Sequence, residues 1–278
     1  MIRRNAHKYP ISAQCKILGI SRGSYYYAPK PPKDETHLED AVQAAFDENR
    51  RLYGSRKIKE VMRKKGITVS RRKICRIMKH RGLESAYTRH KYKNHNKKVN
   101  EAEIPNLLDR QFDNKERLAA VVSDLTYVKV GQKWHYVCIL LDLYNREIIG
   151  YSSGPRRDAA LVYAAFASVK INLKHIQMFH TDRGSEFDNA LINQLLDAFE
   201  IKRSLSLKGC PYDNAVAEST FKMIKTEFIK RRIFDTSEQL ALELSDYVHW
   251  FNHIRLHSAL DYLSPVDFRN DSLSFLFI

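Results

Sequence analysis

The stretch LAAVVSDLTYVKV, residues 118–130, decides which fold the second part of this 278-residue chain adopts. It is rich in β-branched residues and alternates in part, so we expect a strand. GQK follows as a turn, and residues 134–143 and 146–153 have the composition of two further strands. Three consecutive strands with tight turns between them predict an antiparallel meander.

The pattern then alternates between the helical and the strand period. Helices are expected over residues 157–171, 187–199, 213–232 and 237–254, and strands over 175–181 and 201–207. The order β-β-β-α-β-α-β-α-α predicts an α/β domain, with a mixed sheet flanked by helices.

Two aspartates occupy unusual places in these strands. Asp124 lies in mid-strand on the same face as Val122 and Thr126, where a carboxylate is unfavourable unless it is paired or binds a metal. Asp182, in HTDRGSEF (residues 180–187), ends a strand, and strand ends are where open sheets with helical crossovers bind ligands. The alternative for Asp182 is a plain polar turn after a strand.

A third acid, Glu218, lies on the long helix over residues 213–232. Glu218 is at the border of the apolar stripe that contains Phe221 and Ile224, and Asn214, Glu218 and Lys225 fall on nearly one line. That edge of the helix can direct a carboxylate toward the strand ends, with Asn214 supporting the site from one turn earlier. By the same geometry, Glu227 is on the other border and is expected at the surface.

Asp124, Asp182 and Glu218 together would form an all-oxygen site, which hard divalent ions such as Mg²⁺ or Mn²⁺ prefer. Two such ions about 3.5–4 Å apart can promote phosphoryl transfer. From residue types alone, three unrelated acids are an equal alternative. Asp142 is the next acid to consider, and its place at a strand end favours a turn or capping role.

The net charge of +15 is confined to one part of the chain. Residues 1–100 contain 26 lysines and arginines against 8 acids, whereas residues 101–278 contain 21 against 24. A basic region of this kind favours a polyanion, above all nucleic acid, over a merely solvated basic surface. The four scattered cysteines show no metal-binding spacing and are expected to be reduced thiols of a cytoplasmic protein, and neither a membrane span nor a secretory signal is expected.

The basic region contains two patterns typical of helix-turn-helix units. The first, ISAQCKILGISRGSYYY, lies in a segment spanning residues 1–34, where Gly19 can end one helix and Ser21 can cap the next. The second, clearer one lies in a domain spanning residues 35–86, with an apolar stripe at helical spacing on each of its two helices. In the second, Ser70 can cap a helix whose exposed side would carry Arg71, Arg72, Lys73, Arg76 and Lys79. Such a helix suits the DNA major groove, although a helical hairpin with a solvated basic face has the same pattern.

Residues 87–112 comprise a linker and an entry segment, and the linker, residues 87–103, has no apolar period and many cations. We expect a basic linker that follows a phosphate backbone, with a tether that makes no contacts as the alternative.

Three blocks of this sequence, SDLTYV, HTDRGSEF and YDNAVAESTFKMIKTE, resemble the catalytic blocks of transposases in the retroviral-integrase superfamily. Asp182 and Glu218 are separated by 35 residues, which is the spacing of that superfamily, and Lys225 follows seven residues after Glu218 as it does there. The tail WFNHIRLHSALDYLSPVDF resembles the closing motif, and NLLDRQF resembles the segment that leads into the first strand. The match is strongest to the second-frame (OrfB type) product of two-frame bacterial insertion sequences. Leu118 and Thr220 depart from the aromatic residues usual at those positions.

This resemblance implies a ribonuclease-H-like integrase catalytic core with a helical tail over residues 113–278, preceded by an all-α helix-turn-helix region. It implies hydrolysis at an element end to free a 3′-hydroxyl, followed by strand transfer. Asp124, Asp182 and Glu218 would hold two Mg²⁺ ions, with Mn²⁺ as a substitute, and Lys225 would contact DNA. The implied partners are double-stranded DNA at terminal inverted repeats, target DNA, further copies of the chain and the first-frame (OrfA-type) protein.

Further residues near the blocks have two interpretations each. Arg183 and Lys222 are expected either to touch phosphate or to be solvated, and His180 either supports the acids or is a packed strand-end histidine. Two rival functions also stay open at this point. One is a non-catalytic DNA-binding regulator of transposition, and the other is a structure-selective nuclease on the same fold.

Overall fold

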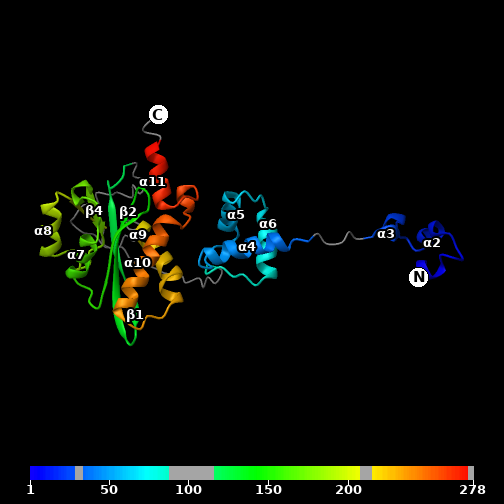
Figure 1. Cartoon of the computed structure of the whole chain (residues 1–278), viewed down its shortest axis with the longest axis horizontal. Helices are drawn as coiled ribbons and strands as arrows, with labels where there is room; N and C mark the ends of the chain where they lie inside the picture. The colour runs from blue at the N-terminus through cyan, green and yellow to red at the C-terminus, as the bar shows by residue number, and fades with distance from the viewer. Residues whose placement is uncertain (29–33, 88–115, 207–214, 275–278) are drawn as a thin grey trace. The chain divides into compact units, whose positions relative to one another are not determined.

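The computed structural model describes residues 1–28, 34–87, 116–206 and 215–274 (Figure 1). It separates into two compact units, Met1–Ala41 and Val42–Ile278. Most of the predicted basic linker, the NLLDRQF segment and Asn214 lie outside the described residues.

The first unit contains three short helices and the start of a fourth: α1 (Ile2–Asn5), α2 (Ile11–Ile17), α3 (Arg22–Tyr26) and α4 (Thr36–Glu48). As the sequence predicts, the chain turns at Gly19, whose φ of +64° suits glycine, and Ser21 caps α3 by accepting a hydrogen bond from the Ser24 amide. Cys15 is buried, whereas Ile17 is 84% exposed, so α2 is only partly covered.

The second unit begins with a helical module formed by the rest of α4, α5 (Ser55–Lys64) and α6 (Arg71–His80). Ile58, Ile74 and Ile77 are fully buried in it, which is the apolar stripe that the helical spacing predicts. The chain leaves α5 at Gly66, where φ is +76°. Ser70 then caps α6 through a hydrogen bond from the Lys73 amide to its hydroxyl (3.2 Å).

A five-stranded mixed sheet with the order β3-β2-β1-β4-β5 forms the centre of the remaining chain. Its strands are β1 (Val121–Val130), β2 (Lys133–Asp142), β3 (Ile148–Gly154), β4 (Met178–Thr181) and β5 (Lys202–Leu205). The first three strands pair antiparallel, so the predicted meander is confirmed, and β4 joins β1 in parallel. This order puts β1 and β4, the strands that lead to Asp124 and Asp182, side by side.

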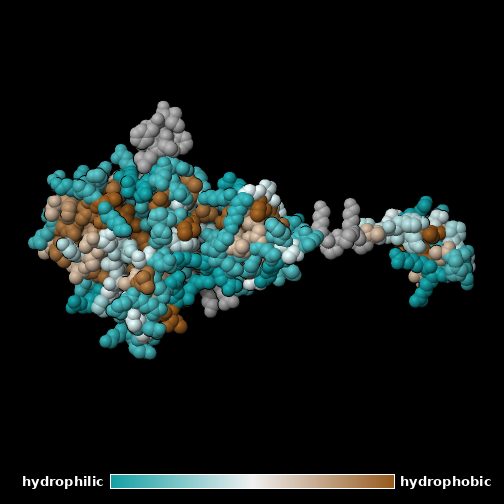
Figure 2. All heavy atoms as spheres, viewed as in Figure 1, coloured by the Kyte–Doolittle hydropathy of each residue, from teal (hydrophilic) through white to brown (hydrophobic). Residues whose placement is uncertain are grey.

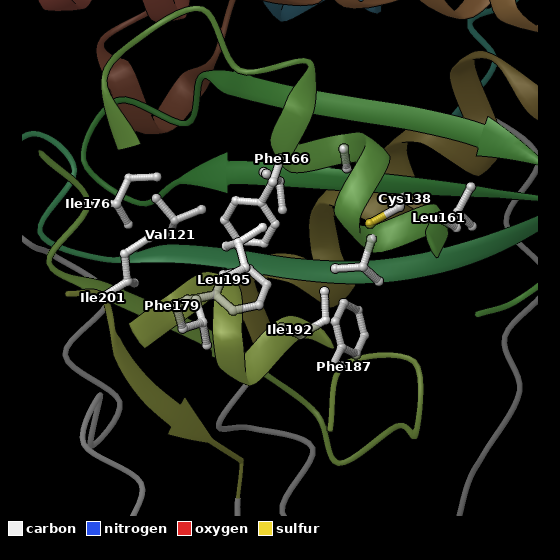
Figure 3. Close-up of a cluster of buried hydrophobic side chains, with 14 of the residues drawn as sticks. Val121, Cys138, Leu161, Phe166, Ile176, Phe179, Phe187, Ile192, Leu195 and Ile201 are labelled. Carbon is white, nitrogen blue, oxygen red and sulfur yellow. The ribbon is translucent and has the colours of Figure 1, made fainter. Parts of the chain in front are cut away.

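Helices cover both faces of the sheet (Figure 1). On one side lie α7 (Ala159–Ala167) and α8 (Ala190–Ala198), and on the other α9 (Ala215–Glu227), α10 (Ser237–His253) and α11 (Pro265–Ser274). Short 3-10 turns complete the chain: η1 (Leu173–His175), η3 (Ile229–Arg231) and η4 (Ser258–Leu260). The buried cluster beneath α7 and α8 includes Phe166, Phe179 and Phe187, and the Phe179 ring packs edge to face with each of the other two (Figure 3).

The prediction that Glu227 lies at the surface is wrong, because this carboxylate is buried at the end of α9. The Arg255 side chain pairs with it at 2.7 Å, and the hydroxyls of Tyr247 (3.0 Å) and Tyr87 also donate to it. Burial alone would raise the pKa of Glu227, but the charge and hydrogen bonds of Arg255 hold it below its ordinary value. Helical spacing placed Glu227 at the border of the stripe, and residues distant in the sequence then covered that border.

Further contacts join the helical module to the sheet-containing part of the second unit. Tyr53, just before α5, accepts a hydrogen bond from the Leu256 amide to its hydroxyl (2.8 Å). Arg50 pairs with Asp246 (2.9 Å) and lies over the Trp250 ring. In the described parts of the chain, none of the helices is both long and apolar enough to cross a lipid bilayer.

Candidate active site

The register of the sheet places Asp124 and Asp182 at matching positions of neighbouring strands. Val122 pairs with His180; Asp124 lies two residues farther along β1, and Asp182 lies two residues beyond His180, just past the end of β4. Because side chains alternate, Asp124 belongs to the face on which Val122 lies, and adjacent strands are about 4.8 Å apart. The parallel pairing therefore directs two carboxylates to one region at the end of β4.

The turn after β4 fixes the backbone around Asp182. The Gly184 amide donates a hydrogen bond to Asp182 Oδ1 (3.0 Å), and Arg183 Nε donates to the Ser206 carbonyl (3.1 Å). His180 is fully buried and bonds to the hydroxyls of Ser204 (2.8 Å) and Ser206 (3.0 Å) on the next strand. These bonds tie the end of β4 to β5 and fix where Asp182 begins its turn.

Glu218 lies in the first turn of α9 and is exposed, while Phe221 and Ile224 on the same helix are buried. The helix packs beside β1. The position and the burial pattern of α9 are those that the helical spacing predicts, with the acid at the edge of the apolar stripe.

Asp124 carries the clearest electrostatic signature of the site. The pKa of Asp124 is raised to about 6, chiefly by burial and also by the charges of Asp182 and Glu218, against the Leu125 amide and Lys225, which lower it. The two other acids are thus near enough to act on Asp124. Within the described ranges, however, no group of three His, Cys, Asp or Glu side chains is close enough to enclose a metal ion.

An arginine that the sequence analysis did not single out also belongs to this region. Arg157 pairs with the buried Glu186 (Nε–Oε1 2.8 Å), and that bond, with the charges of Asp182 and Asp124, raises the pKa of Arg157. A Cβ at position 184 would lie 2.5 Å from Glu186 Oε1, so any larger residue there would displace the Glu186 carboxylate. The glycine of the DRG turn was a signal for this close approach, but nothing in the sequence links residues 157 and 186.

The basic residues predicted to contact DNA fall into two places. Lys222 and Lys225 are on α9, and the Lys225 ammonium lies 5.1 Å from the centre of the Tyr127 ring. The α6 residues Arg71, Arg72, Arg76 and Lys79 are exposed, and Lys73 is half-buried. Ser70, Arg72, Lys73 and Arg76 line an open hollow of about 390 Å³.

Asp142 has the turn role that its place at a strand end predicts. It is fully buried and accepts hydrogen bonds from the amides of Leu118 (3.1 Å) and Tyr144 (3.0 Å). Both carboxylate oxygens are therefore occupied by backbone donors.

Three protein families match this chain along most of its length. An integrase core domain matches residues 115–211, a second integrase core domain matches residues 218–273, and an HTH-like domain matches residues 33–92. The first two matches include Asp124, Asp182 and Glu218, and the third includes α5 and α6.

Curated relatives extend over nearly the same length. The chain is 31% identical over 246 residues to the transposase for insertion sequence element IS904 of Lactococcus lactis, a match that covers 86% of this chain and 97% of that protein. It is 28% identical over 287 residues to transposase InsF for insertion sequence IS3A of Escherichia coli, with 98% of each chain covered.

Solved structures of viral integrases also align with the chain. The catalytic core domain of BIV integrase aligns at 14% identity with a TM-score of 0.42, covering 58% of this chain and 99% of that one. A chain of the simian T-cell lymphotropic virus intasome aligns at 11% identity and a TM-score of 0.46, covering 82% of this chain and 73% of that one.

Proposed function

Because this chain belongs to the transposases of bacterial insertion sequences, enzymes with an integrase core, we propose that Asp124, Asp182 and Glu218 form its catalytic site. The observation that carries this proposal is the convergence of charge on Asp124, whose pKa both other acids raise. A carboxylate whose pKa is raised by the charges of neighbouring acids marks a region where a cation is favoured.

The donor set fits hard divalent cations, since all three side chains offer oxygen. We propose Mg²⁺, with Mn²⁺ as a substitute and two ions per site. Bound there, the ions would activate an attacking oxygen and stabilise a leaving one in phosphodiester hydrolysis and strand transfer.

The chain's own residues would hold and orient the DNA. Lys225 would neutralise a phosphate beside Asp124, because its ammonium already acts on that carboxylate. His180 and Asn214 would steady the neighbouring acids, and Arg183 and Lys222 would touch phosphate. The basic face of α6 would enter the major groove at the element's terminal inverted repeat.

We further propose that the chain acts as a homo-oligomer that joins element ends to target DNA, in association or fusion with the first-frame protein. Two element ends and a target DNA must meet in one reaction, and one HTH-like module cannot bind all three DNA segments at once.

A strand-transfer assay tests the site. Labelled element-end DNA is incubated with the full chain and Mg²⁺ or Mn²⁺, and wild type is compared with Glu218→Gln. We expect both proteins to bind the DNA and wild type alone to release a 3′-hydroxyl end and join it, with the variant at least about 100-fold slower. Glu238→Gln, an exposed change on α10, serves as the matched control and should behave as wild type.

Joining that continues undiminished in Glu218→Gln would remove Glu218 from the site. Hydrolysis without any joining by wild type would instead identify a nuclease. If wild type binds but does not react, adding the first-frame protein shows whether the catalytic site requires that partner.

A further inference from the structure

A small aromatic pocket surrounded by cations lies at the tip of the β1–β2 hairpin. It is lined chiefly by Tyr127 and Trp134 of the hairpin, Lys225 of α9, and Lys230, Arg232 and Phe234 just after α9, and its volume is about 260 Å³. We call it the hairpin pocket. Figure 1 shows the hairpin at the lower end of the domain, and Figure 2 shows mostly hydrophilic, teal to pale side chains at this end.

The two aromatic rings of the hairpin pocket are open to solvent. Tyr127 is 58% exposed and Trp134 is 55% exposed, and their ring centres are 5.3 Å apart with the planes nearly perpendicular. Lys129, two residues after Tyr127 and on the same face of β1, pairs with Trp134 on β2, so Tyr127 and Trp134 are diagonal neighbours on that face. Phe234, by contrast, is buried and packs on Phe228, so it gives the pocket a rigid floor.

Cations surround these rings. The Lys225 ammonium is 5.1 Å from the centre of the Tyr127 ring, and Lys230 and Arg232 approach from the turn after α9. Arg232 is held in place by an ion pair with Glu243 and by the Phe228 ring. Exposed aromatic rings with cations beside them are the features that bind unpaired nucleotides, since the rings stack on bases and the cations hold phosphates.

The hairpin pocket is close to the proposed catalytic acids. Tyr127 is three residues beyond Asp124 on β1, which is about 10 Å along the strand. That length corresponds to about three stacked nucleotides of one DNA strand. Alternation places the two side chains on opposite faces, so a DNA strand that reaches both passes the edge of β1, which pairs with β4 only at Val121 and Val122. Lys225 links the two places, because its charge acts on Asp124 while its ammonium lies over Tyr127.

We propose that the hairpin pocket binds an unpaired base of the DNA strand being processed, two or three nucleotides from the reacting phosphate. The base stacks on Trp134 and Tyr127, and its phosphate lies between Lys225 and Lys230. This inference rests on the proposed function and adds to it the state of the substrate, a DNA end that is opened rather than fully paired. A base needs a flat apolar surface and a nearby positive charge, and the pocket supplies both.

The tryptophans of the chain provide a direct readout. There are two, Trp134 in the pocket and Trp250, which is buried. The full chain is titrated with a flush-ended duplex and with the same duplex carrying three unpaired 3′ nucleotides, each replaced in turn by fluorescent 2-aminopurine. We expect the opened end to bind more tightly and to quench tryptophan emission, with 2-aminopurine quenched most at one position.

Variants then assign the effect to the pocket. Trp134→Ala should weaken binding of the opened end about five- to hundredfold while changing the flush end little, and Trp134→Phe should restore most of the loss. Tyr163→Ala on α7 removes another half-exposed aromatic ring outside the pocket and is the matched control. Because Trp134 is exposed, unfolding midpoints of its variants should equal that of wild type.

Equal binding of both ends by wild type, or an equal loss for both ends in Trp134→Ala, would overturn the inference. The second result would mean that the hairpin touches duplex backbone. If no DNA changes the tryptophan emission, the hairpin pocket does not bind DNA, and the inference is likewise overturned. These outcomes are independent of the catalytic test, because Glu218→Gln should retain the quenching while losing strand transfer.

Discussion

At the scale of single residues, Asp124 is a group whose chemistry works against stability. Folding places its carboxylate in a partly dry position beside two other acids, which raises its pKa to about 6 from 3.8. Above that pH the ionised form is less favourable in the folded chain than in the unfolded one. Such an unfavourable charge is typical of a functional position, and a bound divalent cation would relieve it.

Replacing Asp124 by Asn should therefore stabilise the protein while abolishing strand transfer. We expect the free energy of unfolding at pH 8 without divalent ions to rise by about 1–3 kcal/mol, since two pKa units correspond to about 3 kcal/mol. Asn retains an acceptor for the Leu125 amide, which now donates to Asp124 Oδ1 at 2.7 Å. Denaturant unfolding measures the change, and a lower midpoint for the variant would contradict it.

The pKa of Asp142 is raised, like that of Asp124, but here the carboxylate has a structural role in a turn. Burial raises the pKa of Asp142 to about 6, against hydrogen bonds from the Tyr144 and Leu118 amides that lower it. The folded chain therefore binds more protons than the unfolded chain between about pH 4 and 6, and this contribution to stability is lost as the pH rises through that window.

Asp142→Asn should remove the corresponding pH dependence. Unfolding midpoints measured from pH 4 to 7 are expected to fall less steeply with pH in the variant than in wild type. The variant should be less stable at every pH, because its amide nitrogen faces one of the two backbone N–H donors. A slope identical to that of wild type would mean that Asp142 does not titrate in this window.

At the scale of elements, α9 combines a reactive end with an anchored end. Glu218 in its first turn is exposed, whereas Glu227 at its last residue is buried against Arg255, the two side chains being 1% and 4% exposed. The anchor fixes the axial position of the helix, and with it the position of Glu218 and Lys225 beside β1.

Glu227→Gln should accordingly be far more damaging than a matched change at the surface. It leaves the Arg255 charge buried and unpaired, which should cost about 3–5 kcal/mol of unfolding free energy. Glu243→Gln removes the partner of Arg232 at a partly exposed pair and should cost about 0–1 kcal/mol. Thermal and denaturant unfolding of both variants test the difference, and similar losses would show that Glu227 is no special anchor.

In the whole molecule, the basic residues lie on helices that are separate in sequence from the sheet that carries Asp124. The basic helices α5 and α6 belong to the same compact unit as the sheet, and Tyr53, Arg50 and Tyr87 contact Leu256, Asp246 of α10 and Glu227 of α9. Half-buried Lys57 is part of this junction, where burial and the Arg255 charge lower its pKa to about 7. DNA held by α6 would thus be held by the body that carries the acids.

Salt dependence should reveal how α6 contributes. Replacing Arg72 and Arg76 by Ala should weaken binding of element-end DNA and reduce the slope of log Kd against log salt by about 1 for each phosphate contact removed. Lys59→Ala, an exposed cation on α5, is the matched control and should change the slope little. An unchanged slope in the double variant would mean that α6 does not touch the backbone.

Local patterns in the sequence were sufficient for much of this protein. β-Branched alternation predicted β1, caps at Ser21 and Ser70 predicted the starts of α3 and α6, and helical spacing predicted the buried side of α9, because each depends on residues a few positions apart. The family blocks further predicted the integrase core and nominated Asp124, Asp182 and Glu218, whose role as ligands remains a prediction.

Only the tertiary structure decided what depends on residues far apart in the chain. The parallel register of β1 with β4 sets Asp124 beside Asp182, Arg157 meets Glu186 across 29 positions, and Arg255 and Tyr87 turn Glu227 from an expected surface acid into a buried one. The period of apolar residues predicts which side of a helix or strand is apolar. The burial and the pKa of a residue at the border of that side depend on which residues, distant in the sequence, pack against it.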